Sequence, residues 1–152
     1  YLNWFGNLKT RDYEIANRSM QELGVYSYRE KPLKSLSGGE RKKVWIAMTM
    51  ARQAPILVLD EPTNSLDLQA ILEFMKLLKK QCKQRHTTII MVLHDINLAS
   101  RYSDELIVLK QGKKVAKGSP YEVVKPELIK QVYNISAKVK QEAQTPFMIP
   151  YV

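Results

Sequence analysis

Two adjacent acids follow the first strongly apolar run of the sequence. Asp60 and Glu61 end "ILVLDE", residues 56–61, which we predict to be a buried strand. In open α/β sheets ligands bind beyond the carboxyl ends of the strands, where two carboxylates have separate uses in phosphoryl transfer. Asp60 could hold Mg²⁺ through water, because Mg²⁺ prefers oxygen ligands and keeps part of its hydration shell, and Glu61 could deprotonate an attacking water. The alternative is a pair of acids that caps the next helix or binds a lysine.

The segment "SLSGGE", residues 35–40, combines Ser37, Gly38, Gly39 and Glu40 at the start of a predicted helix. The helix is predicted to run to about residue 53, with one apolar face made by Val44, Ala47, Met48 and Ala51. Glycine is a poor helix former, so this glycine pair has a local cost. In one interpretation Ser37 is an N-cap and the glycines belong to a turn. In the other, the Ser37 hydroxyl and the first backbone N–H groups bind an anion that glycine allows to approach.

A second apolar run, "TTIIMVLHD" at residues 87–95, ends in His94 and Asp95. We expect His94 to emerge at the same edge of a parallel sheet as Asp60 and Glu61. A histidine at a strand end is commonly a structural hydrogen-bonding residue, but beside a phosphate it could bind that phosphate or hold the attacking water. His86 lies in a polar stretch and is expected at the surface.

Composition limits the class of protein. The 152 residues, 45% of them hydrophobic, suffice for a globular core, and the single cysteine, Cys82, indicates a buried thiol in a reducing compartment. The apolar runs are too short to span a bilayer, and no signal-peptide pattern is present. The net charge of +9 is spread along the chain, which favours a solvated surface over a face for nucleic acid or anionic lipid.

The predicted elements divide the chain into a helical piece, residues 1–54, and an α/β piece, residues 55–152. The first contains a helix over 12–23 that ends at Gly24, and then the helix that begins at Ser37. In the second, two buried strands flank a helix over 68–82. A hairpin turning at Gln111-Gly112 and two short helices near Pro120 and Pro126 follow. Buried strands that alternate with helices predict an α/β fold with a parallel sheet.

Four of these segments together resemble the nucleotide-binding subunit of ABC transporters: "LSGGE" at 36–40, "ILVLDEPT" at 56–63, "SLD" at 65–67 and His94. The resemblance implies a P-loop NTPase-like core with a helical subdomain, and ATP and Mg²⁺ as cofactors. It makes Glu61 the catalytic base, His94 the switch histidine, Asp60 the Mg²⁺ residue and Asp67 part of the D-loop. It also implies that the signature residues contact ATP held by the opposite subunit of a head-to-tail dimer. These residues are Ser37, Gly38, Gly39 and Glu40.

The phosphate-binding motif of that family, G-x-x-x-x-G-K-[ST], does not occur in the 152 residues; the single Gly-Lys pair is Gly112-Lys113 in the predicted hairpin turn. We therefore expect the chain to be the C-terminal portion of such a subunit, beginning after the Q-loop and ending at a natural C-terminus. The absence of an initial methionine fits this expectation. Alone, the chain should neither bind Mg-ATP tightly nor hydrolyse it.

Within the family, "WIAMTMARQAPILVLDEPT" and "LHDINLASRYSDELIVLKQGKKVAKGSP" resemble subunits that drive uptake of iron–siderophore, haem or cobalamin chelates. Zinc, manganese and molybdate importers are near neighbours. The implied partners are a second ATPase subunit, membrane permease subunits and, indirectly, a substrate-binding protein, at the cytoplasmic side of the membrane and without specific nucleic acid. Two alternatives remain: a soluble ABC ATPase acting on DNA or ribosomes, and a non-enzymatic interaction module.

Overall fold

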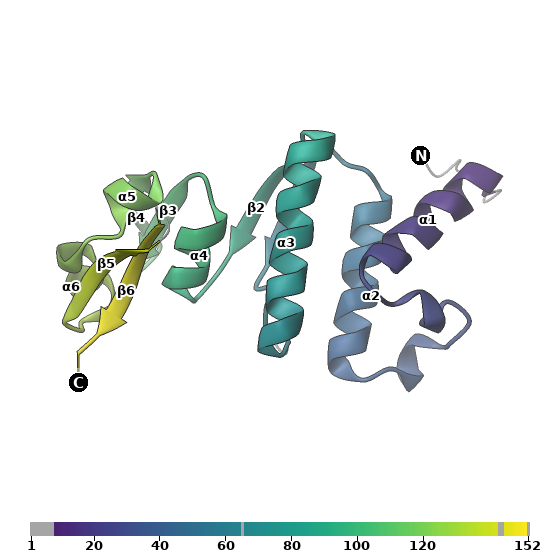
Figure 1. Ribbon diagram of the computed structural model, residues 1–152, viewed down its shortest axis with the longest axis horizontal. Helices are drawn as coiled ribbons and strands as arrows, with labels where there is room; N and C mark the ends of the chain where they lie inside the picture. Colours follow the sequence, from purple (N-terminus) through teal and green to yellow (C-terminus); the bar gives the residue numbers. More distant parts are fainter. Residues whose placement is uncertain (1–7, 65, 143–144, 152) are drawn as a thin grey trace. The chain divides into compact units, whose positions relative to one another are not determined.

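A computed structural model describes residues 8–64, 66–142 and 145–151 of the chain. Its contacts divide the chain into two compact units, one ending at Met91 and the other beginning at Val92. Figure 1 labels most of the helices and strands of both units, and each unit is described by itself.

The first unit begins with helices, as the sequence predicts. They are α1 (Thr10–Glu22), the 3-10 turns η1 (Tyr26–Tyr28) and η2 (Leu33–Ser35), and α2 (Gly38–Ala51). Helix α1 packs against α2 (Figure 1). The predicted stop of α1 is confirmed, because Gly24 lies just past its end with φ of +67°, a conformation that favours glycine. The helix at Ser37 is confirmed as well.

The buried face of α2 differs in part from the predicted one. Ile46, Ala47 and Met50 are buried, whereas Met48 is 47% exposed, so placing Met48 on the buried face is wrong. Trp45 on the same helix is 52% exposed. Apolar residues occur on two sides of α2, and helical spacing alone therefore does not select the side that packs.

The predicted strand–helix–strand unit follows, with β1 (Ile56–Asp60), α3 (Leu68–Arg85) and β2 (Thr88–Val92). The two strands pair, and the backbone N–H of Thr88 donates to the carbonyl of Pro55 at 2.9 Å. The strands thus begin side by side and run parallel, with α3 as the crossover. Both β1 and β2 end at one edge of this sheet.

The side chains on one side of β1 are buried, and those on the other side are exposed to solvent. Leu57 and Leu59 are buried, but Ile56 is 56% and Val58 is 68% exposed. Buried α3 side chains include Phe74, Met75, Leu77 and Leu78. Cys82 is half-buried, less enclosed than the sequence predicts. Exposed apolar residues on a strand are expected where a parallel sheet lacks part of its cover.

The second unit contains α4 (Ile96–Tyr102), β3 (Leu106–Lys110), β4 (Lys113–Gly118), α5 (Pro120–Val123), α6 (Pro126–Tyr133), β5 (Ala137–Glu142) and β6 (Thr145–Pro150). The β3–β4 hairpin turns at Gln111 and Gly112, with φ of +49° and +73°, as predicted. The antiparallel pair β5–β6 was not predicted. The core of this unit is formed by Ile96, Leu106, Val123, Val124, Ile129 and Ala137.

In the part of the chain that the structure describes, every helix falls short of the length and apolar character that crossing a membrane requires.

Candidate functional site

The first predicted site residue, Ser37, is the N-cap of α2. Its Oγ accepts a hydrogen bond from the backbone N–H of Glu40 at 3.3 Å. In return, the Glu40 carboxylate accepts one from the backbone N–H of Ser37 at 2.8 Å. This is a capping box, in which serine and glutamate satisfy each other's backbone donors. Ser37 is therefore confirmed as an N-cap with an exposed hydroxyl, whereas placing the glycines in a turn is wrong, because Gly38 and Gly39 are the first residues of α2.

Glu40 is held by a further group that the sequence analysis missed. The Tyr28 hydroxyl donates to its carboxylate, and this bond, with those from Ser37, lowers the pKa of Glu40 to about 2. The same bond to the ionised Glu40 raises the pKa of Tyr28. Glu40 is thus an anion that is hydrogen-bonded at its own helix start, and its contact with a partner's ATP stays a prediction.

Gly38 is the first residue of α2, and the fold gives no reason for glycine there. Its φ is not in the left-handed region. A Cβ added at Gly38 would meet no atom of the described residues within 4 Å. Alanine would fit the backbone and the space, and it is the better helix former. Among the described residues, none therefore requires glycine at this position.

The paired acids lie at the end of β1. Asp60 is the last residue of the strand and is exposed. Glu61, half-buried, follows with φ of +45°, a left-handed conformation that costs a residue with a side chain about 1–2 kcal/mol. Such strain concentrates at functional sites, where surrounding contacts maintain it. This backbone conformation makes Glu61 the most distinctive of the predicted site residues.

Two side chains maintain the turn that carries Glu61. The Asn64 side-chain amide donates to the Glu61 carboxylate, and the Asn64 backbone N–H donates to the Glu61 carbonyl at 3.2 Å. From α2, the Lys42 ammonium donates to the carbonyl of Glu61 at 2.7 Å and to that of Asn64 at 2.8 Å. Neither Lys42 nor Asn64 was predicted as a site residue, because both act through contacts that local sequence patterns do not encode.

Asp67 begins the next helix. Its side chain accepts from the backbone N–H of Ala70 at 2.8 Å, which makes it the N-cap of α3. Residue 65, the first of "SLD", lies outside the described residues. Asp67 is thus an exposed helix cap at the start of α3, the helix that follows the Glu61 turn.

His94 belongs to the second unit, where it is exposed two residues beyond β2. The next residue, Asp95, caps α4 by accepting from the N–H groups of Asn97 and Leu98 at 2.8 and 3.0 Å. The Asn97 amide group in turn exchanges two hydrogen bonds with the backbone of Met148 in β6. His94 is therefore placed by a well-anchored helix start, and its proximity to Glu61 stays a prediction.

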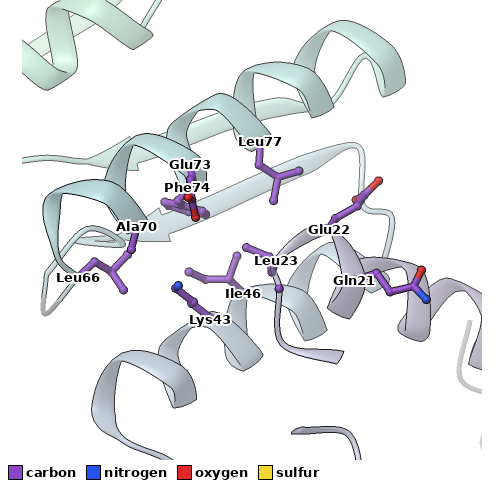
Figure 2. A pocket seen from close by; sticks show the side chains of 11 residues that line it. Gln21, Glu22, Leu23, Lys43, Ile46, Leu66, Ala70, Glu73, Phe74 and Leu77 are labelled. Atoms are coloured by element: carbon purple, nitrogen blue, oxygen red, sulfur yellow. The ribbon is translucent and has the colours of Figure 1, made fainter. Parts of the chain in front are cut away.

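A cavity of about 470 Å³ lies between α1, α2 and α3 (Figure 2). Its lining includes the apolar side chains of Leu23, Ile46, Phe74 and Leu77, and its charged members are Glu22, Lys43 and Glu73. Among the described residues, none of the predicted site residues lines it. The predicted site residues therefore lie outside this cavity.

The residues at the end of β1 suit a metal ion whose ligands are mostly water and phosphate oxygens. Among the residues described, no three His, Cys, Asp or Glu side chains gather in a way that could hold an ion. The exposed carboxylate of Asp60 is an oxygen donor of the type Mg²⁺ prefers, and Mg²⁺ commonly keeps waters and binds phosphate oxygens. The Asp60 carboxylate therefore fits a Mg²⁺ ion that it would hold through the ion's water molecules.

Comparison with known proteins gives relatives over nearly the whole chain. The sequence profile of the ABC transporter family matches residues 4–64. The iron(3+)-hydroxamate import ATP-binding protein FhuC of Bacillus subtilis (strain 168) is 42% identical over 141 residues, which are 93% of this chain and 52% of FhuC. The petrobactin import ATP-binding protein FpuC of Bacillus anthracis is 43% identical over 150 residues, 99% of this chain and 55% of FpuC. The chain thus spans about half the length of these relatives.

Solved structures agree. CbiO1 of Clostridium perfringens, part of the ABC transporter complex CbiONQ, is 32% identical with a TM-score of 0.68, over 82% of this chain and 50% of CbiO1. The dimeric bacterial ABC transporter cassette MJ0796 is 29% identical with a TM-score of 0.68, over 76% of this chain and 50% of the cassette. With its signature segment, its strand-end acids and these relatives, the chain is similar over nearly its whole length to ATP-binding proteins of the ABC transporter family.

Proposed function

We propose that these residues serve an ATP-hydrolysing subunit of an ABC import system, which works as a head-to-tail pair of subunits and drives uptake of an iron chelate. The observation that carries the proposal is Glu61. Glu61 directly follows strand β1 on a strained backbone, and its carboxylate is fixed by Asn64. A carboxylate held in this way is suited to orient one water molecule and accept its proton.

Each site residue then has a chemical task. Glu61 takes the proton of the attacking water, and Asn64 restricts the orientation of that carboxylate. Asp60 binds Mg²⁺ through water. When bound, Mg²⁺ neutralises charge on the phosphate oxygens. His94 hydrogen-bonds the terminal phosphate or the water. Asp67 caps α3 and so fixes the end of the turn that begins at Glu61.

The start of α2 serves the nucleotide of the second subunit. The Ser37 hydroxyl accepts from the Glu40 N–H and retains its own proton, which it donates to a phosphate oxygen. Gly38 and Gly39 let that phosphate come close to the backbone, and the helix N-terminus favours negative charge. In this arrangement residues 1–54 are the helical subdomain and residues 55–152 belong to the ATPase core.

We infer the class of cargo from the names of the relatives. FhuC and FpuC are named for import of iron(3+)-hydroxamate and petrobactin, and the E. coli (strain K12) relative FepC, 36% identical over 148 residues, for transport of ferric enterobactin. We assign this chain to the same cargo class, iron chelates, with permease subunits as partners and the cytoplasmic side of the membrane as its location.

The test is a chimera in which residues 1–152 replace the segment that they match in FhuC. Glu61→Gln in this chimera should retain ATP binding, lower turnover by about a hundredfold or more and trap an ATP-bound dimer, because the amide cannot accept the proton. The matched control is Glu127→Gln, the same exchange at an exposed residue of α6, which should leave turnover unchanged. Turnover of Glu61→Gln near that of the parent chimera would remove Glu61 as the base.

The cargo class is tested with the same chimera in B. subtilis cells that lack FhuC. Restored uptake of iron(3+)-hydroxamate supports coupling to an iron-chelate permease. A chimera that hydrolyses ATP but restores no uptake would reject the iron-chelate assignment and leave the ATPase assignment intact.

A further inference from the structure

We propose that Lys42 is a positioning residue that ties the signature helix α2 to the turn carrying Glu61, so that one chain couples its contact with the partner's nucleotide to the placement of its own base. The coupling rests on the function proposed above, whereas the tie itself does not.

The tie is defined by two hydrogen bonds between segments that are distant in sequence. Lys42 is half-buried, and its Nζ donates at 2.7 Å to the Glu61 carbonyl and at 2.8 Å to the Asn64 carbonyl. These acceptors lie 19 and 22 residues further along the chain. An ammonium group has three donors, so one N–H of Lys42 remains beyond these two bonds. The two carbonyls bracket the turn, and a single side chain therefore fixes both of its ends.

The turn needs such a constraint. Glu61 adopts a left-handed backbone conformation, φ +45°, which a residue with a Cβ does not prefer. The internal bonds of the turn are the backbone bond from Asn64 to the Glu61 carbonyl, at 3.2 Å, and the Asn64 side-chain bond to the Glu61 carboxylate. The bond from Lys42 to the Glu61 carbonyl is the shorter of the two bonds that this oxygen accepts from Lys42 and the Asn64 N–H.

The position of Lys42 on α2 means that the two hydrogen bonds connect the start of this helix to the backbone of Glu61. Lys42 lies just over one turn beyond Ser37, the exposed N-cap proposed to contact the partner's nucleotide. A rigid helix transmits a displacement of its first turn to Lys42, and the two bonds transmit it to the backbone of Glu61. The acceptors are neutral carbonyls, so arginine at position 42 can replace the donors, whereas methionine has a similar length and no donor.

The tie is tested in the 152-residue chain by NMR, with no nucleotide present. Lys42→Met should lower the backbone order parameters of Glu61, Thr63 and Asn64 from roughly 0.85 to below about 0.6. It should also shift the carbonyl ¹³C resonances of Glu61 and Asn64, whereas Lys42→Arg should restore both readouts. The control is Lys79→Met on an exposed position of α3, which should change neither. Unchanged order parameters and carbonyl shifts in Lys42→Met would overturn the tie.

The role in hydrolysis is tested with the FhuC chimera. Lys42→Met should lower kcat for ATP about 10- to 100-fold, because a displacement on the order of 1 Å misaligns the base, and should leave KM within about twofold. Lys42→Arg should recover most of kcat, which a general loss of folding would not allow. An unchanged kcat in Lys42→Met would overturn the positioning role. A parent chimera without ATPase activity would instead refute the proposed function, and the NMR readout would still decide whether the tie exists.

Discussion

Replacing Gly38 by alanine should stabilise the isolated chain and impair the function proposed for it. A Cβ at Gly38 meets no described atom within 4 Å, and the backbone there is compatible with alanine. Alanine restricts the unfolded chain without straining the folded one, which is worth about 0.4–1 kcal/mol. For a chain of 152 residues this gain corresponds to a rise in Tm of about 1–4 °C. Thermal and urea unfolding of the 152-residue chain measure it.

Gly24→Ala is the matched control. A Cβ at Gly24 also meets no described atom within 4 Å, but its φ is +67°, so the two glycines differ in backbone conformation and not in available space. Alanine at position 24 should therefore destabilise the chain by about 1–2 kcal/mol. In the same unfolding assay, Gly38→Ala should raise the free energy of unfolding and Gly24→Ala should lower it.

The functional half of this prediction uses the FhuC chimera. Gly38→Ala should weaken ATP-dependent dimerisation, because the added methyl group stands where the partner's phosphate approaches the helix start. Destabilisation of the isolated chain by Gly38→Ala would refute the reasoning, since the fold itself would then require glycine. A more stable chain with normal ATP-dependent dimerisation would leave Gly38 without a role in the site.

Two further predictions concern the start of α2. The pKa of Glu40 is lowered from 4.5 to about 2, so its carboxylate stabilises the fold fully above pH 4.5, and this contribution is lost as the pH falls toward 2. Tyr28→Phe removes the largest cause of that shift, and urea unfolding between pH 7 and pH 2.5 should show a shallower acid loss than in the parent chain; equal slopes would contradict the Tyr28–Glu40 bond. In the chimera, Ser37→Arg should leave ATP affinity unchanged and abolish ATP-dependent dimerisation. Mixing it with a Walker A variant should restore part of the dimerisation, because each mixed dimer contains one intact site; no restoration would indicate that Ser37 acts on its own subunit's nucleotide.

Local chemistry made a large part of this fold predictable. The cap at Ser37, the stop at Gly24 and the Gln111-Gly112 turn each depend on residues within a few positions of one another, and each is confirmed. The parallel strands around α3 followed from two apolar runs separated by a helical pattern, but the predicted burial of the second run is wrong, because no residue of β2 is buried. The wrong assignment of Met48 arose because α2 has apolar residues on two sides, and packing rather than spacing decides which side is buried.

The contacts that shape the candidate site were less predictable, because they join residues distant in sequence. Glu61 could be selected from its position after an apolar run, but its left-handed backbone and its bond from Lys42 could not. Tyr28 and Glu40 are separated by a polar stretch of sequence without apolar periodicity, so no sequence pattern predicts their hydrogen bond. The β5–β6 pair was missed although Ala137 and Val139 alternate with lysines, which is the spacing of a half-buried strand.

Two residues break local rules of folding in opposite directions. Gly38 stands where a helix prefers a side chain, and Glu61 stands where the backbone prefers glycine. In the proposed function, contact with the partner's phosphate accounts for glycine at position 38, and the need for a fixed carboxylate accounts for the backbone conformation of Glu61. Lys42 connects the helix that carries one exception to the turn that carries the other. We therefore attribute the low helix propensity of Gly38 and the strained backbone of Glu61 to the same proposed function. In that function, the shape of the helix start and the placement of the base are set together.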